Sequence, residues 1–267
     1  MVIQKKTLKS EGTNKTRNHY AAMQEALEQA VKKNTLNAEK IGVAFSGGVD
    51  SGVIAFLAGK FSKNVVLLSV GLSNSSDLAR VKPLAKKMKM KIATHILNEK
   101  EIMENYTRAK KILKTDDELQ CTLGAVNVSI AKLAQEKGIR VVLVGSGADE
   151  LFCGYGAFDR VRNDEKACEK LRAEKVENVE EHDVKREKAC AKAFGIEVRA
   201  PFLEKEFAAL ALQIPAIENL RGKYGKIRKN SLRTLAEKMG VPREMVEAPK
   251  KAMQYGSGAQ KIIAKRK

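Results

Sequence analysis

Short apolar runs alternate with longer amphipathic segments through the first part of the chain. Four runs have the length and aliphatic content of buried strands, at residues 41–45, 65–70, 91–97 and 140–145. Apolar residues at helical spacing fill the intervals, at residues 51–60, 77–89 and 99–137, and residues 18–33 show the same spacing before the first run. This alternation predicts a doubly wound, Rossmann-like parallel α/β sheet with helices on both faces.

The pattern changes after residue 158, where no further strand is evident. Residues 159–195 and 204–239 instead have the charged, amphipathic pattern of helices. We therefore predict three parts: a flexible basic N-terminus at residues 1–17, an α/β core at 18–158, and a helical C-terminal part at 159–267. The last part is expected to complete the active site, since ligands of such sheets lie beyond the carboxyl ends of the strands.

The loop after the first strand, Ser46-Gly-Gly-Val-Asp-Ser51, carries the clearest chemical signal. Gly47 and Gly48 allow a tight turn that brings backbone N–H groups close to an anion. Ser46 and Ser51 add hydroxyl donors, and the following helix directs its positive dipole end at the same point. An ordinary Gly-Gly turn is the simpler interpretation, but the flanking serines favour a phosphate site. Asp50 would repel a phosphate unless a cation lay between them, which predicts a Mg²⁺ ligand.

The loop after the fourth strand repeats this arrangement. A buried strand runs into Gly145-Ser-Gly-Ala-Asp-Glu150, which presents two neighbouring carboxylates. Asp149 would lie at the same edge of the sheet as Asp50, and two acids that share one cation with triphosphate oxygens can hold Mg-ATP. The alternative is that Asp149 only caps the next helix.

The first loop resembles the PP-loop of the ATP pyrophosphatases, which split ATP into AMP and pyrophosphate. From about residue 41 to about residue 258, the chain resembles the synthetase domain of asparagine synthetases and the related β-lactam synthetases. Besides the two loops above, the motifs that carry this resemblance are Ser69-Val-Gly-Leu72, Ser76-Asp-Leu78, Gly154-Tyr155, Gly195-Ile-Glu-Val-Arg-Ala-Pro-Phe-Leu203, Lys229-Asn-Ser-Leu-Arg233 and Pro249-Lys-Lys-Ala252.

The resemblance implies an ATP-dependent, AMP-forming ligase, with ATP and Mg²⁺ as cofactors. It implies that one set of residues binds pyrophosphate and magnesium: Ser46, Gly47, Gly48, Asp50 and Ser51. It also implies an adenosine frame of Ala44, Val70 and Gly145, with Asp149 as the second magnesium ligand. Lys250 matches the lysine that neutralises the departing pyrophosphate, and Lys229 is expected to be a second phosphate contact.

Departures from the family pattern gather in the part that would bind the acceptor acid. Ser146 stands where asparagine synthetases carry a glutamate and β-lactam synthetases a tyrosine, so the catalytic group at this position is changed. That glutamate takes part in proton transfer, which a serine cannot do at neutral pH. The helix at residues 117–132 has no arginine for an aspartate carboxylate, and Ala248 replaces a common arginine. The neutral side chains that this helix offers instead are Gln120, Thr122 and Asn127.

Because the chain begins Met-Val-Ile-Gln, we expect it to act without the family's N-terminal glutaminase domain. We therefore expect it to join a small acid, aspartate or a relative, to free ammonia, to another amine, or to ammonia from a separate glutaminase subunit. The absence of a secretory signal, of a long apolar run and of Cys-x-x-Cys pairs predicts a cytoplasmic protein without a membrane partner.

Two other functions stay open, and the net charge of +18 suggests the first of them. It fits a PP-loop enzyme that adenylates a tRNA base, although 5% aromatic residues and no tryptophan leave little for base stacking. A solvated basic surface explains the same charge without nucleic acid. The serine at position 146 would also suit a nucleotide-binding partner without catalytic activity.

Overall fold

The computed structural model describes residues 3–249 and 251–265, and it confirms the predicted parallel α/β fold. Five parallel strands form one sheet in the order β3-β2-β1-β4-β5. The strands are β1 (Ile41–Ala44), β2 (Val65–Gly71), β3 (Lys91–Ile96), β4 (Val141–Leu143) and β5 (Glu197–Arg199).

The strand order reverses between β1 and β4, and this is where a ligand site is expected. From β1 the chain winds outward through β2 to β3, and it then returns to place β4 on the other side of β1. Val43 pairs in register with Leu143, so β1 and β4 end side by side. The two loops that the sequence singled out therefore leave the sheet at its topological switch point.

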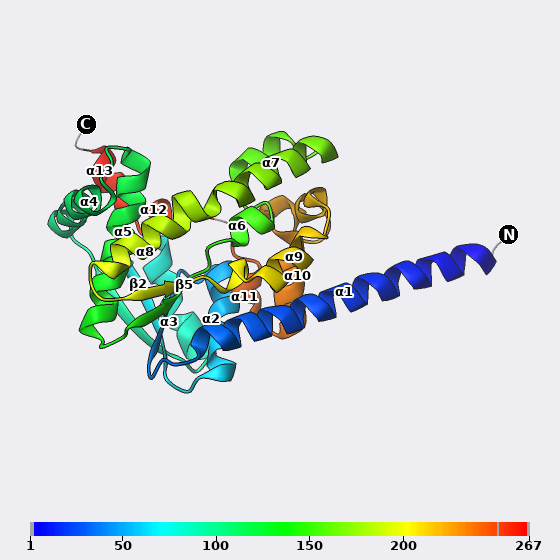
Figure 1. The fold of residues 1–267 in the computed structure, drawn as a ribbon, viewed down its shortest axis with the longest axis horizontal. Coiled ribbons are helices and arrows are strands. Elements are labelled where there is room, and N and C mark those ends of the chain that lie inside the picture. Colours follow the sequence, from blue (N-terminus) through cyan, green and yellow to red (C-terminus); the bar gives the residue numbers. More distant parts are fainter. Residues whose placement is uncertain (1–2, 250, 266–267) are drawn as a thin grey trace.

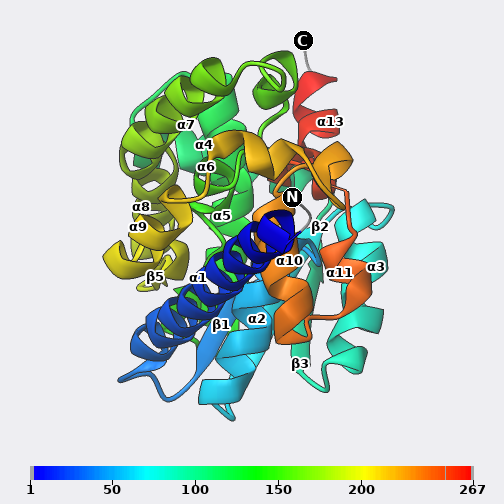
Figure 2. The same cartoon turned by 90° about the vertical axis from the view of Figure 1, so that its right-hand side faces the viewer.

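Alternation of side chains along the strands builds a separate core on each face of the sheet. One face, with Val43, Leu67 and Leu143, packs against several helices, namely α1 (Ile3–Thr35), α2 (Val49–Phe61), α3 (Ser76–Lys87), α9 (Lys205–Leu212) and α10 (Asn230–Met239). The other face, with Leu68 and Val142, packs against α4 (Glu99–Leu113), α5 (Glu118–Glu136) and α13 (Ala259–Ala264). Figure 1 shows α1 running past this body, and Figure 2 shows it lying along α2 and α10.

The strand β5 was not predicted, because the interpretation of the sequence recognised no strand after residue 158. It is a three-residue edge strand of charge-valine-charge pattern, in which Val198 alone is buried. So short a run has no periodicity to detect.

Two helix boundaries also differ from the expectation. The segment predicted as one helical stretch at 99–137 is two helices, because Lys114 takes a left-handed conformation and Asp117 caps α5 by accepting from Gln120 N at 2.7 Å. The first helix begins at Ile3 instead of residue 18, since no proline interrupts the polar residues before it.

The C-terminal part is mostly helical, as predicted, and it surrounds the carboxyl edge of the sheet. Its longest run joins α7 (Glu165–Val179), a π-helical turn η2 (Glu180–Val184) and α8 (Lys185–Lys192). Two short elements connect β4 to this part, namely α6 (Ala148–Leu151) and the 3₁₀ turn η1 (Gly156–Arg160). The other short elements lie within it: α11 (Arg243–Val246), α12 (Met253–Gly256), and the 3₁₀ turns η3 (Pro201–Leu203), η4 (Ala216–Leu220) and η5 (Gly225–Ile227).

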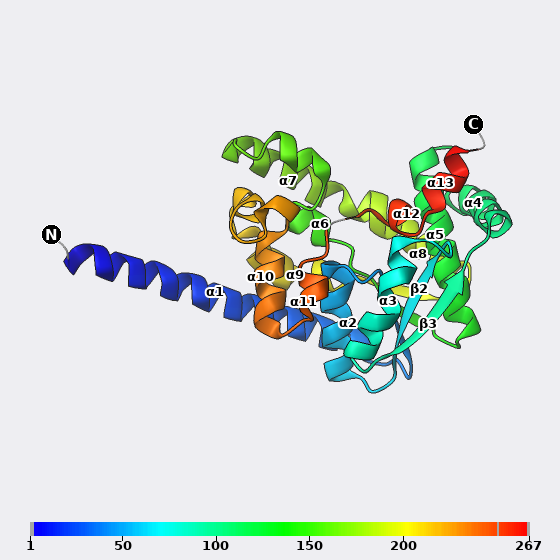
Figure 3. The same ribbon diagram turned by 180° about the vertical axis from the view of Figure 1, so that it is seen from behind.

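The helix α12 returns the chain to the sheet, next to α5 (Figure 3). Leu72 N, just beyond β2, donates to Ser257 O at 2.9 Å, which ties this end of the chain to the strand. In the part of the chain that the structure describes, no helix has the length and apolar character needed to cross a membrane.

Candidate functional site

Hydrogen bonds of its own serine hydroxyl groups and of one arginine fix the conformation of the loop after β1. Ser46 N donates to Ser51 Oγ at 3.2 Å, and the two serine hydroxyls also lie 3.2 Å apart. From α3, Arg80 Nε donates to Ser46 O at 2.8 Å. Gly47 has φ of 74°, a left-handed conformation that favours glycine. Since Gly48 has no side chain to cap α2, the first N–H groups of this helix are available to an anion.

The loop after β4 packs closely against the start of α2. A Cβ atom on Gly145 would lie 3.0 Å from Asp50 Cβ and 3.3 Å from Ser51 N. Glycine at this position therefore lets the two switch-point loops touch. This contact places Asp149, four residues later, on the same side as Asp50.

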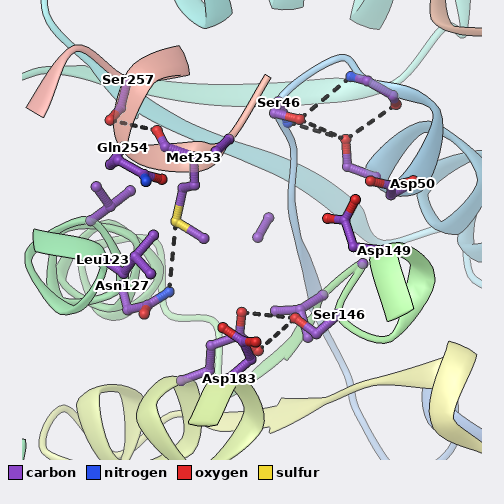
Figure 4. Close-up of a pocket in the computed structure, with 18 of the residues that line it drawn as sticks. Ser46, Asp50, Leu123, Asn127, Ser146, Asp149, Asp183, Met253, Gln254 and Ser257 are labelled. Atoms are coloured by element: carbon purple, nitrogen blue, oxygen red, sulfur yellow. Dashed lines mark hydrogen bonds between the residues drawn. The ribbon is translucent and has the colours of Figure 1, made fainter. Parts of the chain in front are cut away.

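The carboxylates of Asp50 and Asp149 converge on one buried ammonium group. Lys229 Nζ lies 2.7 Å from both carboxylate oxygens of Asp50 and 2.7 Å from Asp149 Oδ1. The lysine side chain is 0% exposed, whereas the two aspartates keep 20% and 19% of their side-chain surface. Figure 4 shows the two carboxyl groups pointing toward each other at one wall of a cavity. The predicted convergence of these acids is thus present, with a lysine between them.

The backbone at Lys229 and Gly154 is shaped for this contact. Arg228 and Lys229 both have positive φ, 63° and 57°, a conformation that costs roughly 1 kcal/mol or more per non-glycine residue. A Cβ on Gly154 would lie 1.9 Å from Asp149 Oδ1 and 2.2 Å from Lys229 Cε. Only glycine leaves room for the pair here, which accounts for the Gly-Tyr motif after Asp149.

The donor atoms at this wall suit Mg²⁺ only if phosphate oxygens join them. Carboxylate oxygens are the ligands that Mg²⁺ prefers, and the ammonium group of Lys229 already occupies a position that favours positive charge. Among the described residues, no group of three or more His, Cys, Asp and Glu side chains could hold a metal. Asp50 and Asp149 therefore fit the usual Mg²⁺ arrangement of one or two carboxylates with substrate phosphates.

A second carboxylate group lies at the wall formed by α8, beside Ser146. Ser146 Oγ donates to Oε1 and Oε2 of Glu187, at 2.8 Å each. Figure 4 shows Ser146 next to the helix that carries Asp183, on the other side of the cavity from Ser257. Glu187 is 5% exposed, and burial raises the pKa of its carboxyl to about 7.

The neighbouring acid, Glu150, accepts a hydrogen bond from the hydroxyl of Tyr155. Burial, and then the charge of Asp149, raise the pKa of Glu150 to about 7. Burial also raises the pKa of the Tyr155 hydroxyl, so this hydroxyl stays protonated and donates.

The helix α5 has no arginine of its own, but a buried arginine of α8 contacts the side of α5 that lines the cavity. Arg186 Nη1 donates to Gln120 Oε1 at 2.8 Å, and its Nε donates to Asn127 Oδ1 at 3.2 Å. Its Nη2 donates to Asp183 Oδ1 at 2.6 Å. The third neutral side chain noted in the sequence, Thr122, donates instead to Glu118 O of its own helix and does not line the cavity.

Both walls belong to one cavity of about 700 Å³. Most of the predicted site residues line it: Ala44, Ser46, Gly48, Asp50, Ser51, Val70, Gly145, Ser146, Asp149 and Lys229. Gly47 shapes the loop without lining the cavity, and Lys250 lies outside the described residues. The acceptor-side residues Glu150, Arg186 and Glu187 line the same cavity.

The fold and the site together define a class of protein: a doubly wound α/β protein with a glycine-rich loop, Ser46–Ser51, that lines a cavity at the switch point of the sheet. The sequence model of the asparagine synthase family matches residues 22–180 and 160–266. The chain is 34% identical over 272 residues to "Putative asparagine synthetase [glutamine-hydrolyzing] 1" of Methanocaldococcus jannaschii, covering 90% of this chain and 50% of that protein. It is 29% identical over 247 residues to the glutamine-hydrolysing asparagine synthetase of Gallus gallus, covering 88% of this chain and 43% of that protein.

The chain therefore belongs to the asparagine synthase family, as its motifs predicted, and spans about half the length of these relatives. Among solved structures, the NH3-dependent NAD synthetase from Campylobacter jejuni is 15% identical with a TM-score of 0.41, over 93% of each chain.

Three functional candidates were missed from the sequence: Glu187, Arg186 and the supporting Arg80. Arg186 and Glu187 lie in a charged helix whose pattern is that of a solvated surface, so nothing local marks them as buried. In the sequence, Glu187 is marked only by its arginine neighbour and by its position ten residues before the Glu197–Arg199 segment that forms β5. Arg80 follows the Ser76-Asp-Leu78 motif, and its role depends on the packing of α3 against the first loop.

Proposed function

We propose that this chain is the synthetase part of an ATP-dependent, AMP-forming ligase. It would adenylate the carboxylate of aspartate or a related small acid and pass the acyl group to ammonia or an amine. One observation carries the proposal: two acids from separate switch-point loops meet at Lys229 in the same cavity that Arg186 and Glu187 line. A nucleotide and an acid can thus share one enclosed space.

In this proposal the first loop binds the pyrophosphate portion of ATP. The N–H groups at the start of α2, with the hydroxyls of Ser46 and Ser51, would hold its oxygens. Asp50 and Asp149 would hold Mg²⁺, which when bound neutralises charge that develops on the departing pyrophosphate. Lys229 keeps these two carboxylates together, and Lys250 is the proposed further cation for pyrophosphate.

The acid would bind at the wall formed by α5 and α8. Arg186 supplies a buried guanidinium there, although three of its donors are already engaged by Gln120, Asn127 and Asp183. A small acid would therefore contact the side-chain amides of Gln120 and Asn127, next to the Arg186 guanidinium, whose charge Asp183 partly neutralises. Free ammonia, another amine, or ammonia from a separate glutaminase subunit completes the proposed reaction, in the cytoplasm.

The test is a screen of acid-dependent exchange between ATP and labelled pyrophosphate. Aspartate, glutamate and other small acids are compared with and without Mg²⁺, and product formation is followed with ammonium chloride. We expect exchange with at least one acid, dependent on Mg²⁺, and a loss on the order of 100-fold or more in Asp50→Ala.

The matched control is Glu181→Gln, an exposed carboxylate outside the cavity that pairs with Lys185 at 2.7 Å. It should leave the exchange rate unchanged. Exchange that survives in Asp50→Ala, or the absence of exchange with every acid, would overturn the proposal. Exchange that requires tRNA in place of an acid would favour the base-adenylating alternative.

A further inference from the structure

The serine at position 146 leaves an unanswered question about proton transfer. If an amine attacks an acyl-adenylate, a base must accept a proton from nitrogen, and a serine hydroxyl cannot do so at neutral pH. Ser146 is nonetheless bonded to a carboxylate. Its hydroxyl bridges both oxygens of Glu187, a residue 41 positions later in the chain.

We propose that Glu187, oriented by Ser146, accepts the proton from the attacking amine. This inference rests on the proposed ligase function. The carboxylate that the sequence lacks after β4 is thereby supplied by α8, at the same wall of the cavity. Ser146 acts as a positioning residue, because its hydroxyl fixes the direction of the carboxylate without itself taking the proton.

Three acids lie at this wall, and their partners distinguish them. Asp183 accepts from the guanidinium of Arg186 at 2.6 Å, so its carboxylate is already engaged by a cation. Glu150 accepts from the Tyr155 hydroxyl and lies next to Asp149 in sequence. Glu187 is held by the neutral hydroxyl of Ser146, and it lines the cavity. Asp183 is thus set apart by its cation and Glu150 by its place beside Asp149, the proposed magnesium ligand, which leaves Glu187 as the carboxylate that faces position 146.

The charged and titratable surroundings of Glu187 agree with this assignment. Burial raises the pKa of Glu187 to about 7, Arg186 and Ser146 oppose that rise, and Asp183 and Glu150 add to it. Tyr155 and Cys190 are the other titratable groups close by, and burial raises the pKa of both, so they stay neutral. A carboxylate that titrates near neutrality is suited to accept and release a proton.

The proposed step balances as follows. The amine nitrogen forms a bond to the acyl carbon, and the bond between that carbon and the AMP oxygen breaks, with its electron pair leaving on AMP. The proton displaced from nitrogen passes to Glu187 Oε and then to solvent. When ammonium enters the cavity, Glu187 first removes one proton to give ammonia and releases it to solvent, so that the carboxylate is free to accept the second proton after attack.

The experiment separates adenylation from amide formation in Glu187→Gln. The acid that supports exchange in the screen, aspartate first, is used with ammonium chloride and, separately, with hydroxylamine, which is largely unprotonated at neutral pH. We expect pyrophosphate exchange within about threefold of the parent enzyme. Ammonium-dependent amide formation should fall about 100-fold, with a smaller loss for hydroxylamine.

The pH profile gives a readout that a merely structural role would not change. In the parent enzyme, the rate of amide formation should rise with pH through about 7, and this rise should be lost in Glu187→Gln. Ser146→Ala should keep the rise but move its midpoint. The control, Glu181→Gln, should keep both the rate and the profile.

A second variant protects the test against simple misfolding. The double variant Ser146→Glu with Glu187→Ser returns the carboxylate to the loop after β4. Its rate of ammonium-dependent amide formation should be at least tenfold higher than that of Glu187→Gln. Equal loss of exchange and amide formation in Glu187→Gln, an unchanged pH profile, or equal losses with both nucleophiles would overturn the inference. Absence of exchange in the parent enzyme would instead overturn the proposed function and this inference with it.

Discussion

The two walls of the cavity are built in different ways. The wall of Asp50, Asp149 and Lys229 is called the ATP wall after the proposed function, and the wall of Arg186 and Glu187 is called the acceptor wall. At the ATP wall, short sequence motifs place backbone N–H groups, hydroxyls and carboxylates within a few residues of each other, and Gly145 and Gly154 allow close approach. At the acceptor wall, the contacts join residues from α5, α8 and the loop after β4, such as Arg186 with Gln120, 66 positions apart. The first wall depends on backbone geometry, whereas the second depends on side chains held by packing.

Under the proposed function, this difference would let a chain keep one half of the family's site while the other half changes. A change at the ATP wall disturbs the backbone of both switch-point loops, since Asp50, Gly145 and Asp149 touch or share a partner. At the acceptor wall, a carboxylate lost at position 146 can be supplied by another helix with no change in the backbone. We therefore expect the two walls to respond differently to substitution.

The largest effect is expected from Lys229→Met, which removes the buried cation between Asp50 and Asp149. Removing one partner of a buried ion pair costs about 3–5 kcal/mol, because the two carboxylates lose the buried cation that they share. Urea unfolding should show a loss of this size, part of which millimolar Mg²⁺ should restore. The exposed Lys238→Met on the same helix is the control, and a loss below about 1 kcal/mol in Lys229→Met would show that the two walls do not differ in this way.

At the acceptor wall, the stability should depend on pH through Glu187. Burial raises the folded pKa of Glu187 to about 7, above the ordinary glutamate pKa of 4.5, so the folded state favours the protonated form. The stabilisation is fully present below pH 4.5 and is lost as the pH rises through 7, by roughly 3 kcal/mol at most. Unfolding free energies between pH 4.5 and 8 should therefore fall less steeply in Glu187→Gln. Parallel curves for the two proteins would contradict this account.

The ATP wall and the sheet could be predicted because their information is local. The strands β1, β2 and β4 are buried apolar runs, whereas β3 is a partly exposed edge strand that mixes apolar and polar residues. The glycine-rich loop after β1 and Asp149 follow directly from Gly-Gly and Gly-x-Gly turns beside β1 and β4. The meeting of Asp50 with Asp149 was expected because both follow the carboxyl ends of strands in one parallel sheet, whereas the strand order that places β1 beside β4 came from the structure.

The acceptor wall could not be predicted, because its residues are chosen by tertiary packing. Glu187 and Arg186 lie among lysines in a segment that resembles a solvated helix, yet they are 5% and 4% exposed. The strand β5 was missed for a similar reason, since its three residues pair with β4 only once the C-terminal part has folded back.

An intermediate effect is expected from Gly154→Ala, because the new Cβ would meet Asp149 Oδ1 at 1.9 Å and Lys229 Cε at 2.2 Å. Overpacking of this kind costs about 1–3 kcal/mol. It should also lower pyrophosphate exchange more than amide formation from preformed acyl-adenylate. Gly156→Ala is the stability control, since its Cβ would enter open space. A Gly154→Ala protein with unchanged exchange would show that the spacing of Asp149 and Lys229 is not critical.

The smallest effect is expected from Arg80→Lys, which tests the loop after β1 at the ATP wall. Arg80 uses Nε for Ser46 O, at 2.8 Å, and Nη2 for Asp77 Oδ1, at 2.9 Å. A lysine ammonium cannot match this planar fork, so one hydrogen bond worth about 0.5–1.5 kcal/mol should be lost. The KM for ATP in the exchange assay should rise by up to about tenfold, with the KM for the acid unchanged. The control Lys82→Arg, on the same helix, should alter neither KM. A larger change in the KM for the acid than in the KM for ATP, in Arg80→Lys, would mean that the loop after β1 does not bind the nucleotide.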